Sequence, residues 1–533
     1  MRTPHEELIK IQRRLWMQNR DIIEGSITVK ESGFAAYEKG YLKAVSKFER
    51  VATQDEMLSA IKDARIIYVG DYHTCNQSQR SFLRILKNII KSAPDIIIGM
   101  ELIYQKHQDA VNSFIKGKLK EEAFVKKISL RQRWVFDLWN NFKPLFDFAK
   151  YHKVSIVGID AAPLKATLDE RDLAAAKQII KILEKNPKSK LFVMIGDLHL
   201  AHLPDIVSEL LYENDQRFKS LILYQNSDSI YWKLAKEGLE DRVSLVKISD
   251  NEYCRMHTPP IILQQSYINW LDNEEGEIDF ADARNNFMEM VDQIAGFLGI
   301  NIGKNREKVD VYTSGDLSFL NKLKADKTFS RTALSRIKKQ ILTSESYYIP
   351  QKKIVFLANP SVNHAAEEAV HFIKHSCSGR EFSRSPEDAF FANILHEALG
   401  FFGSKLVNSK RKCFHEDEFR GLVKYFETVK AVKERRFELE TAILVLEFFA
   451  LGKDGFMKKW FKKILKTDLF FPLTHALGYI LGDKLFYAMM SERISKGEVK
   501  EIFYDPWKRE GEPQLVYADL NKRLKGVKIP KRM

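Results

Sequence analysis

The sequence has 533 residues, of which 45% are hydrophobic and 29% charged, and its formal net charge is +14. This length exceeds what one hydrophobic core usually organises, so we expect two or three domains, and the composition excludes a mainly disordered chain. The positive charge is spread along the chain, which weakly favours an anionic partner or membrane surface and disfavours nucleic acid.

Cysteine usage and the chain start bear on the compartment. The four cysteines lie far apart without a CxxC pair, so neither a disulfide framework nor a zinc ribbon is predicted. The first sixteen residues carry charges throughout and lack the apolar stretch of a signal peptide. The longest apolar run, residues 469–482, falls short of the roughly 18 residues of a membrane span. We therefore expect a cytoplasmic protein, or one bound peripherally to a membrane.

The first half of the chain predicts an α/β domain. Residues 1–55 are expected to form an N-terminal helical extension with a helix over 5–24. In residues 56–265, short β-branched runs alternate with helical stretches, which is typical of a mostly parallel sheet covered by helices. The predicted strands are 66–69, 96–100, 155–159, 191–195, 221–224 and 243–248, and the predicted helices are 78–92, 104–116, 121–128, 140–152, 170–185 and 203–212.

The second half, residues 266–533, is predicted to be a mainly α-helical domain of unknown role. The predicted helices are 279–298, 330–343, 362–375, 386–408, 416–451, 456–466 and 484–495, with strands at 309–312 and 353–357.

A repeated tetrapeptide carries the strongest chemical signal. The strand ending at Val69 is followed by Gly-Asp-Tyr-His73, and the strand ending at Ile195 by Gly-Asp-Leu-His199. Glycine permits a sharp turn at a strand end, and open α/β sheets bind ligands at the carboxyl ends of their strands. A single histidine there is commonly structural, but packing does not require the same polar tetrapeptide twice. Both histidines are therefore predicted to serve one site.

Two further strands end in carboxylates. The strand DIIIGM leads into Glu101, and SIVGI leads into Asp160. His73, Glu101 and His199 are a reasonable ligand set for a divalent metal, and equally a reasonable acid/base set without one. For Asp160, an ordinary solvated loop carboxylate is an equally good explanation.

These segments resemble a known family. YVGDYHTCNQSQRSFLRIL, IIIGMELIYQKHQDAVNSFIKGKLKEEAF, LWNNFKPLFDFAKYHKVSIVGIDA and LFVMIGDLHLAH are similar, in this order, to the ChaN-like domain of the Tiki superfamily, often labelled haem-binding uptake. The resemblance covers about 200 residues and extends to the TraB and erythromycin-esterase families. Because the superfamily includes metal-dependent proteases, esterases and haem-binding lipoproteins, fold membership does not settle the reaction.

The resemblance implies roles for individual residues. His73 and His199 match its two histidines and Glu101 its acidic position, and Arg171 resembles the arginine of the esterase and TraB branches, although an ordinary charged helix start explains it equally well. The candidate catalytic residues are Glu101, His73, His199, Asp160 and Arg171; the candidate haem-binding residues are His73, Tyr72, His199 and His202; the candidate metal ligands are His73, Glu101 and His199. The sequence departs from the haem-uptake branch in two ways: it shows no lipoprotein signal, and it carries an added helical half.

The helical half offers two weaker signals. Residues 456–466 place apolar side chains on one face of a helix and five lysines on the other, which suits either an anionic membrane surface or packing on the domain core. Glu367, His371 and His375 stand one helical turn apart, and a solvated helix face explains them better than a metal site.

Three hypotheses follow for function. The α/β domain binds haem, iron or a divalent metal; or it is a hydrolase in which a metal-bound or histidine-polarised water attacks a small-molecule or peptide substrate; or the chain is a membrane-surface scaffold with a vestigial site.

Overall fold

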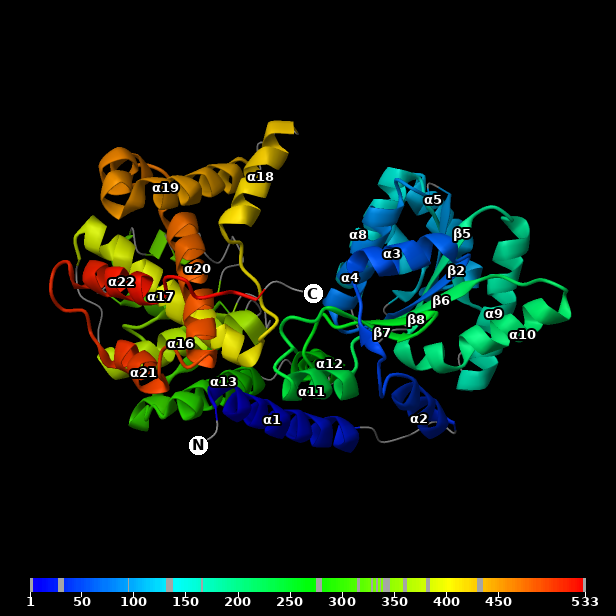
Figure 1. Ribbon diagram of the computed structural model, residues 1–533, viewed down its shortest axis with the longest axis horizontal. Helices are drawn as coiled ribbons and strands as arrows, with labels where there is room; N and C mark the ends of the chain where they lie inside the picture. Colours follow the sequence, from blue (N-terminus) through cyan, green and yellow to red (C-terminus); the bar gives the residue numbers. More distant parts are fainter. Residues whose placement is uncertain are drawn as a thin grey trace. The chain divides into compact units, whose positions relative to one another are not determined.

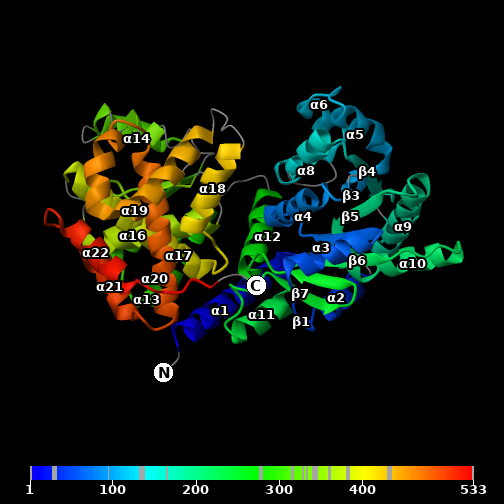
Figure 2. The ribbon, with the colours of Figure 1, turned by 45° about the horizontal axis from the view of Figure 1, so that its top comes forward.

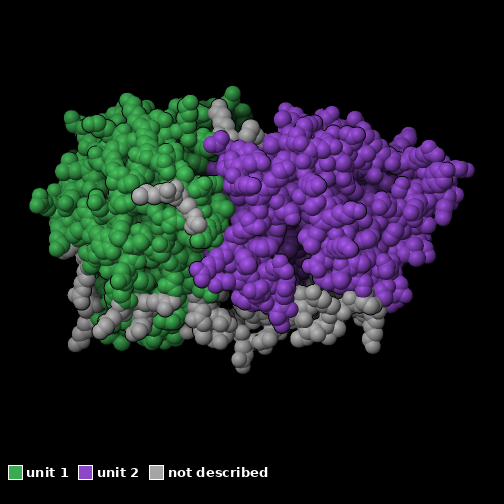
Figure 3. Space-filling view, turned by 60° about the horizontal axis from the view of Figure 1, so that its bottom comes forward, with its two compact units in different colours: residues 1–12, 278–530 green, residues 13–277, 531–533 purple. Residues whose placement is uncertain are grey.

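A computed structural model describes the chain in two compact units (Figure 3). Residues 13–277 form the α/β unit, and residues 1–12 with 278–530 form the helical unit. The description covers residues 3–530 except 27–32, 94, 131–137, 164–165, 275–279, 314–316, 327–328, 332–333, 336, 339–345, 358–361, 380–383 and 429–434.

An eight-stranded sheet forms the centre of the α/β unit (Figure 1), and its strand order is β1-β7-β8-β6-β2-β5-β3-β4. The strands β8, β6, β2, β5, β3 and β4 each run parallel to the next in this order. Strand β7 is antiparallel to both of its neighbours, β1 and β8. The predicted mostly parallel sheet is confirmed, with two short strands, β1 and β8, that the sequence did not indicate. The strands are β1 Arg50–Val51, β2 Ile66–Asp71, β3 Ile96–Tyr104, β4 Ser155–Asp160, β5 Lys190–Gly196, β6 Ser220–Gln225, β7 Leu245–Ser249 and β8 Glu252–Arg255.

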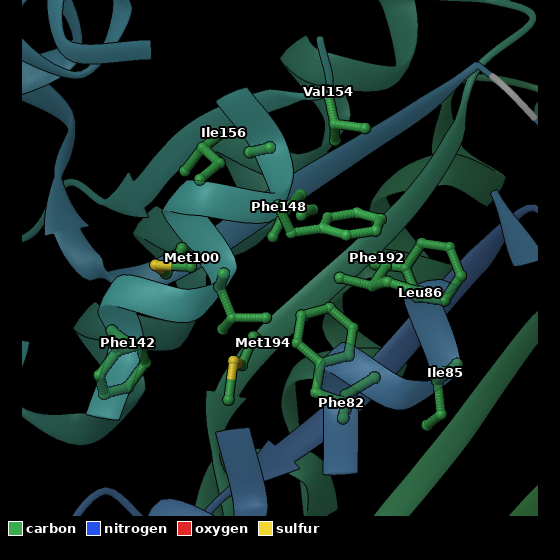
Figure 4. Packing of buried hydrophobic residues seen from close by; sticks show 14 of the residues in the cluster. Phe82, Ile85, Leu86, Met100, Phe142, Phe148, Val154, Ile156, Phe192 and Met194 are labelled. Atoms are coloured by element: carbon green, nitrogen blue, oxygen red, sulfur yellow. The ribbon is translucent and has the colours of Figure 1, made fainter. Parts of the chain in front are cut away.

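Helices cover both faces of this sheet (Figure 1, Figure 2). Because successive strand residues point to opposite faces, Phe192 and Met194 of β5 lie on the face that carries Phe82 of α4 and Phe142 of α8 (Figure 4). Ile66 and Tyr68 of β2 line the opposite face with Pro204, Val207 and Leu211 of α10. The helices are α1 Pro4–Ser26, α2 Phe34–Ala44, α3 Gln54–Asp63, α4 Asn76–Ile89, α5 Gln108–Ile115, α6 Glu121–Lys127, α8 Trp139–His152, α9 Leu168–Lys185, α10 Leu203–Glu213, α11 Asp228–Lys236 and α12 Pro260–Glu274.

The N-terminal segment does not stand apart as expected. Residues 13–55 belong to the α/β unit, where β1 pairs with β7 and α2 packs beside the short helix η2, Asp197–Ala201. Tyr37 of α2 is fully buried there. The charged, scattered pattern of this segment gave no sign of this packing.

The second unit is mainly helical, as predicted, with a three-stranded sheet of order β10-β11-β9. The apolar run that begins at Leu469 forms the start of α20. Pro472 is tolerated in this helix because it lies in the first turn, where the backbone N–H has no partner within the helix. Most of the predicted helix 330–343 lies outside the described residues. The elements are α13 Phe280–Leu298, β9 Asp310–Thr313, α14 Phe319–Ala325, β10 Tyr347–Ile349, β11 Ile354–Leu357, α16 Val362–Ser378, α17 Pro386–Val407, α18 Glu416–Thr428, α19 Arg436–Ile464, α20 Phe470–Met490, α21 Lys496–Tyr504 and α22 Glu512–Arg523.

The lysine-rich segment 456–466 packs within the helical unit. Residues 456–464 are the end of α19 and follow a kink at Gly452 with φ 65°. Phe456 is buried, Phe461 meets Phe390 edge-on, and the Trp460 indole donates a hydrogen bond of 2.9 Å to Glu447. These contacts support the interpretation that this segment packs on the core of the helical unit, and they do not support one in which it lies on a membrane surface. None of the described helices is long and apolar enough to cross a bilayer.

The helix face carrying Glu367, His371 and His375 is not solvated, which corrects the sequence interpretation. Glu367 is buried and accepts a hydrogen bond of 2.8 Å from Arg411, and the His375 ring stacks on His396 of α17 at 5.3 Å. The polar spacing resembles that of an exposed face, because the partners of these side chains lie on distant parts of the chain: Arg411 on the α17–α18 connection and His396 on α17.

Candidate functional site

Strand order brings the predicted site residues together. β2, β5, β3 and β4 are consecutive neighbours in the sheet. His73 follows β2, His199 follows β5, Glu101 lies in β3, and Asp160 ends β4. Since these strands are parallel, their carboxyl ends share one edge. The two Gly-Asp-x-His motifs therefore converge although they are far apart in sequence.

The first histidine is oriented by its own motif. The Nδ1 of His73 donates to Oδ2 of Asp71 at 2.7 Å, and the amide of Gln79 donates to the other oxygen of Asp71 at 2.5 Å. Asp71 is buried, whereas the His73 side chain is 26% exposed. The imidazole is therefore fixed at Nδ1, and its Nε2 turns toward Glu101 at 3.8 Å.

The second histidine is oriented by a different element. Thr167 and Glu170 form a capping box that begins α9, and this start places Arg171 at the end of the first turn and Asp172 directly after it. Asp172, fully buried, accepts a hydrogen bond from Nδ1 of His199 and another of 2.9 Å from the Tyr37 hydroxyl. The Nε2 of His199 lies 3.6 Å from Glu101.

Glu101 lies between the two imidazoles. It is the first residue after the β3–β5 pairing stops at Met100, in an irregular stretch of the β3–β4 pairing, so it is not at the end of β3 as predicted. Its Oε1 accepts from Arg171 at 2.8 Å and its Oε2 from the Gly196 amide at 2.7 Å. Arg171 also reaches Asp160 at 3.9 Å. Arg171 thus faces the site and links the two carboxylates.

We call His73, Glu101 and His199 the His–Glu cluster. A Cβ added at Gly196 would lie 3.4 Å from Nε2 of His73 and 3.5 Å from Cδ2 of His199, so both rings face one point. Two ligands of one ion lie at most about 4 Å apart, since metal–nitrogen bonds are about 2 Å. In the described part of the chain, the cluster does not form a group whose ligand atoms all lie within 4.8 Å. The arrangement therefore fits ligation by one histidine better than chelation by all three residues.

The cluster is strongly polarised. Burial alone would raise the pKa of Glu101, but His199, Arg171 and His73 outweigh it and lower that pKa to about 2. Burial would lower the pKa of His73, but Asp71 and Glu101 raise it to about 9. The pKa of His199 is also raised, because its bond to Asp172 and the charge of Glu101 outweigh burial. At neutral pH the cluster thus holds an anionic Glu101 beside a protonated His73.

This polarisation predicts a pH-dependent stability. Because the pKa of His73 rises from about 6.5 unfolded to about 9 folded, its ion pairs stabilise fully below pH about 6.5 and are lost as pH rises through about 9. Over this interval the protein should lose on the order of 1–2 kcal/mol more unfolding free energy than the variant His73→Gln. Urea denaturation of both proteins at the two ends of the interval measures the difference, and equal losses would contradict the assignment.

Two predicted haem-binding residues do not join the cluster. The His202 ring packs 4.2 Å from the Tyr37 ring, and its Nε2 would lie 2.9 Å from a Cβ at Gly40. Tyr72 is half-buried, and the partial burial and the nearby charge of Asp228 raise its pKa. His202 therefore faces α2, and no described contact links Tyr72 to the His–Glu cluster.

Sequence reasoning missed the residues that orient the histidines. Asp71 stands inside the first motif and Asp172 beside Arg171, so a search for carboxylates near the histidines would have found the first but not the second. Asp197, the equivalent residue of the second motif, has a different environment. Its Oδ1 lies so close to Gly70 that an added Cβ there would be 2.0 Å away. Burial and the charge of Asp71 raise the pKa of Asp197 well above its usual range. The two motifs are therefore alike in sequence but not in hydrogen bonding.

Comparison with known proteins agrees with the resemblance in the sequence. No curated protein matches the chain. Among solved structures, the chain is similar to that titled "Cofacial heme binding to ChaN of Campylobacter jejuni", with 14% identity and a TM-score of 0.24, covering 33% of this chain and 87% of that one. Residues 57–167, which contain His73 and Glu101 but neither Arg171 nor His199, match the family model described as haem-binding uptake, Tiki superfamily, ChaN. This stretch is thus similar to the ChaN family of the Tiki superfamily.

Proposed function

We propose that the α/β unit binds haem, with Nε2 of His73 as the ligand of the iron. The observation that carries the proposal is the orientation of His73 by Asp71 within the segment that matches a haem-binding uptake family. A ligating histidine typically donates its other ring nitrogen to a carboxylate, which fixes the tautomer and makes the free nitrogen a better donor.

The residues present suit an iron ligand at this position. His73 is partly exposed, whereas the side chain of His199 is 8% exposed and those of Glu101 and Asp71 are more deeply buried. A bound haem would supply an iron centre, and the chain's own contribution is to hold His73 through Asp71 and Gln79. Because Nε2 is protonated at neutral pH, iron binding must displace one proton to solvent.

Titration of the purified protein with haemin tests the proposal. The wild type should shift the Soret band to that of a histidine-ligated haem with one haem per chain. His73→Ala should weaken binding by about 100-fold, since loss of a ligand should cost at least as much as loss of a residue that orients one. His152→Ala, an exposed histidine at the end of α8, should bind like wild type. Equal binding by His73→Ala and wild type would exclude His73 as the ligand.

A hydrolase is a second candidate, favoured by the point above Gly196 on which both imidazoles converge. In this reading an imidazole polarises the attacking water, the ionised Glu101 accepts its proton, and Arg171, hydrogen-bonded to Glu101, balances the charge. Substrates would be esters or peptides, as in the protease and erythromycin-esterase branches that the sequence resembles.

Activity assays with ester and peptide substrates distinguish this candidate. Glu101→Gln should lower kcat by roughly 100-fold or more while the fold persists, as removal of an acid/base group does. Hydrolysis that is unchanged in Glu101→Gln would count against the cluster as its source.

A further inference from the structure

Three side chains of different chemistry converge in the helical unit, far along the chain from the His–Glu cluster. Cys413 and His415 lie on the connection between α17 and α18, and Asp483 lies on α20. Nε2 of His415 is 3.5 Å from Sγ of Cys413 and 2.8 Å from Oδ2 of Asp483, and Sγ is 3.9 Å from Oδ2. All three ligand atoms thus lie within 4.8 Å of one another.

These separations match a tetrahedral zinc site. Zinc bonds of about 2.3 Å to sulfur and about 2.0 Å to nitrogen or oxygen put neighbouring donor atoms about 3.3–3.6 Å apart. An ion can therefore enter with side-chain shifts of about half an ångström. Thiolate, imidazole and carboxylate together favour zinc over the hard cations magnesium and calcium.

Neighbouring residues hold the acidic ligand in place. Lys405, almost fully buried, pairs with Oδ1 of Asp483 at 2.8 Å, so the carboxylate cannot turn and Oδ2 stays directed at His415. Lys405 also donates to the Tyr487 hydroxyl at 3.0 Å. Such fixed partners of a ligand are typical of metal sites. Arg411 is occupied by Glu367 and Tyr479 and so leaves the three ligands accessible.

We propose that Cys413, His415 and Asp483 bind one zinc ion that fixes the α17–α18 connection to α20. On binding, the Cys413 S–H bond breaks, the Zn–S bond forms and the proton leaves to solvent. Three protein ligands leave the fourth position to water, and the His415 side chain, 24% exposed, lies on the open side of the site. This site is independent of the haem proposal for the other unit.

Cobalt titration of the full-length, metal-stripped chain tests the site, because Co²⁺ bound to thiolate gives a charge-transfer band that a His/Glu site cannot give. The wild type should develop this band with one Co²⁺ per chain, and Zn²⁺ should abolish it. Cys413→Ser should lack the band and bind Zn²⁺ at least about 100-fold more weakly. Cys377→Ser, a cysteine on α16 in the same unit, should behave like wild type.

Persistence of the band in Cys413→Ser, or its absence in wild type, would overturn the proposal. If Cys413→Ser fails to fold, X-ray absorption at the zinc edge of the unmodified protein decides the matter. One sulfur at about 2.3 Å with nitrogen and oxygen neighbours is the expected result. A zinc environment without sulfur would contradict it.

Discussion

Replacing Asp172 by alanine should lower the free energy of unfolding of the α/β unit by about 3 kcal/mol, because removing one partner of a buried charged pair leaves the other uncompensated. Asp172 is fully buried and accepts hydrogen bonds from His199 and Tyr37, which are themselves buried. Equilibrium denaturation of the full chain, followed by a probe specific to the α/β unit, measures the loss. A cost below about 1 kcal/mol would mean that His199 does not depend on this carboxylate.

Asp169 provides a matched control for this variant. It accepts a hydrogen bond of 2.9 Å from the same Tyr37 hydroxyl, but it is exposed. Asp169→Ala should therefore cost less than about 1 kcal/mol, because a surface acceptor can be replaced by water. The difference between the two variants isolates the contribution of the bond to His199.

In the helical unit, Gly482→Ala should lower stability by about 2 kcal/mol, as overpacking of a close contact does. A Cβ at Gly482 of α20 would lie 2.3 Å from the carbonyl oxygen of Ala398 on α17, and backbone cannot rotate out of the way. The two helices would have to separate along their shared contact. The measurement is the thermal or urea unfolding of the full chain.

Gly421→Ala gives the opposite expectation and serves as the control. Gly421 lies inside α18 with nothing within 4 Å of its added Cβ, so alanine should stabilise the helix by up to about 1 kcal/mol. Equal effects of the two glycine substitutions would show that the α17–α20 contact is not as close as described.

The sequence was informative where residue pattern and local structure agree. Six strands could be predicted from their short apolar and β-branched runs, and His73 and His199 because the same tetrapeptide follows two of these strands. The parallel arrangement that joins these histidines with Glu101 follows from the alternation of strands and helices. Arg171 could be placed near the site only through the family resemblance.

The remaining features depend on contacts between distant segments, which a local pattern does not record. Tyr37 reaches Asp172 from a helix in a weakly patterned N-terminal segment, and β1 has only two residues. The sequence predicts Glu367 to be exposed because its partners, Arg411 and Tyr479, lie much later in the chain. The proximity of Cys413 and His415 to Asp483 leaves no local pattern, because the first two lie on the α17–α18 connection and the third lies on α20.

A crystal structure of the haem-loaded protein tests the central claim most directly. The expected result is one haem in the α/β unit with iron bonded to Nε2 of His73 at about 2 Å, while Nδ1 remains hydrogen-bonded to Asp71. Haem bound through another residue, with His73 still facing Glu101, would contradict the account.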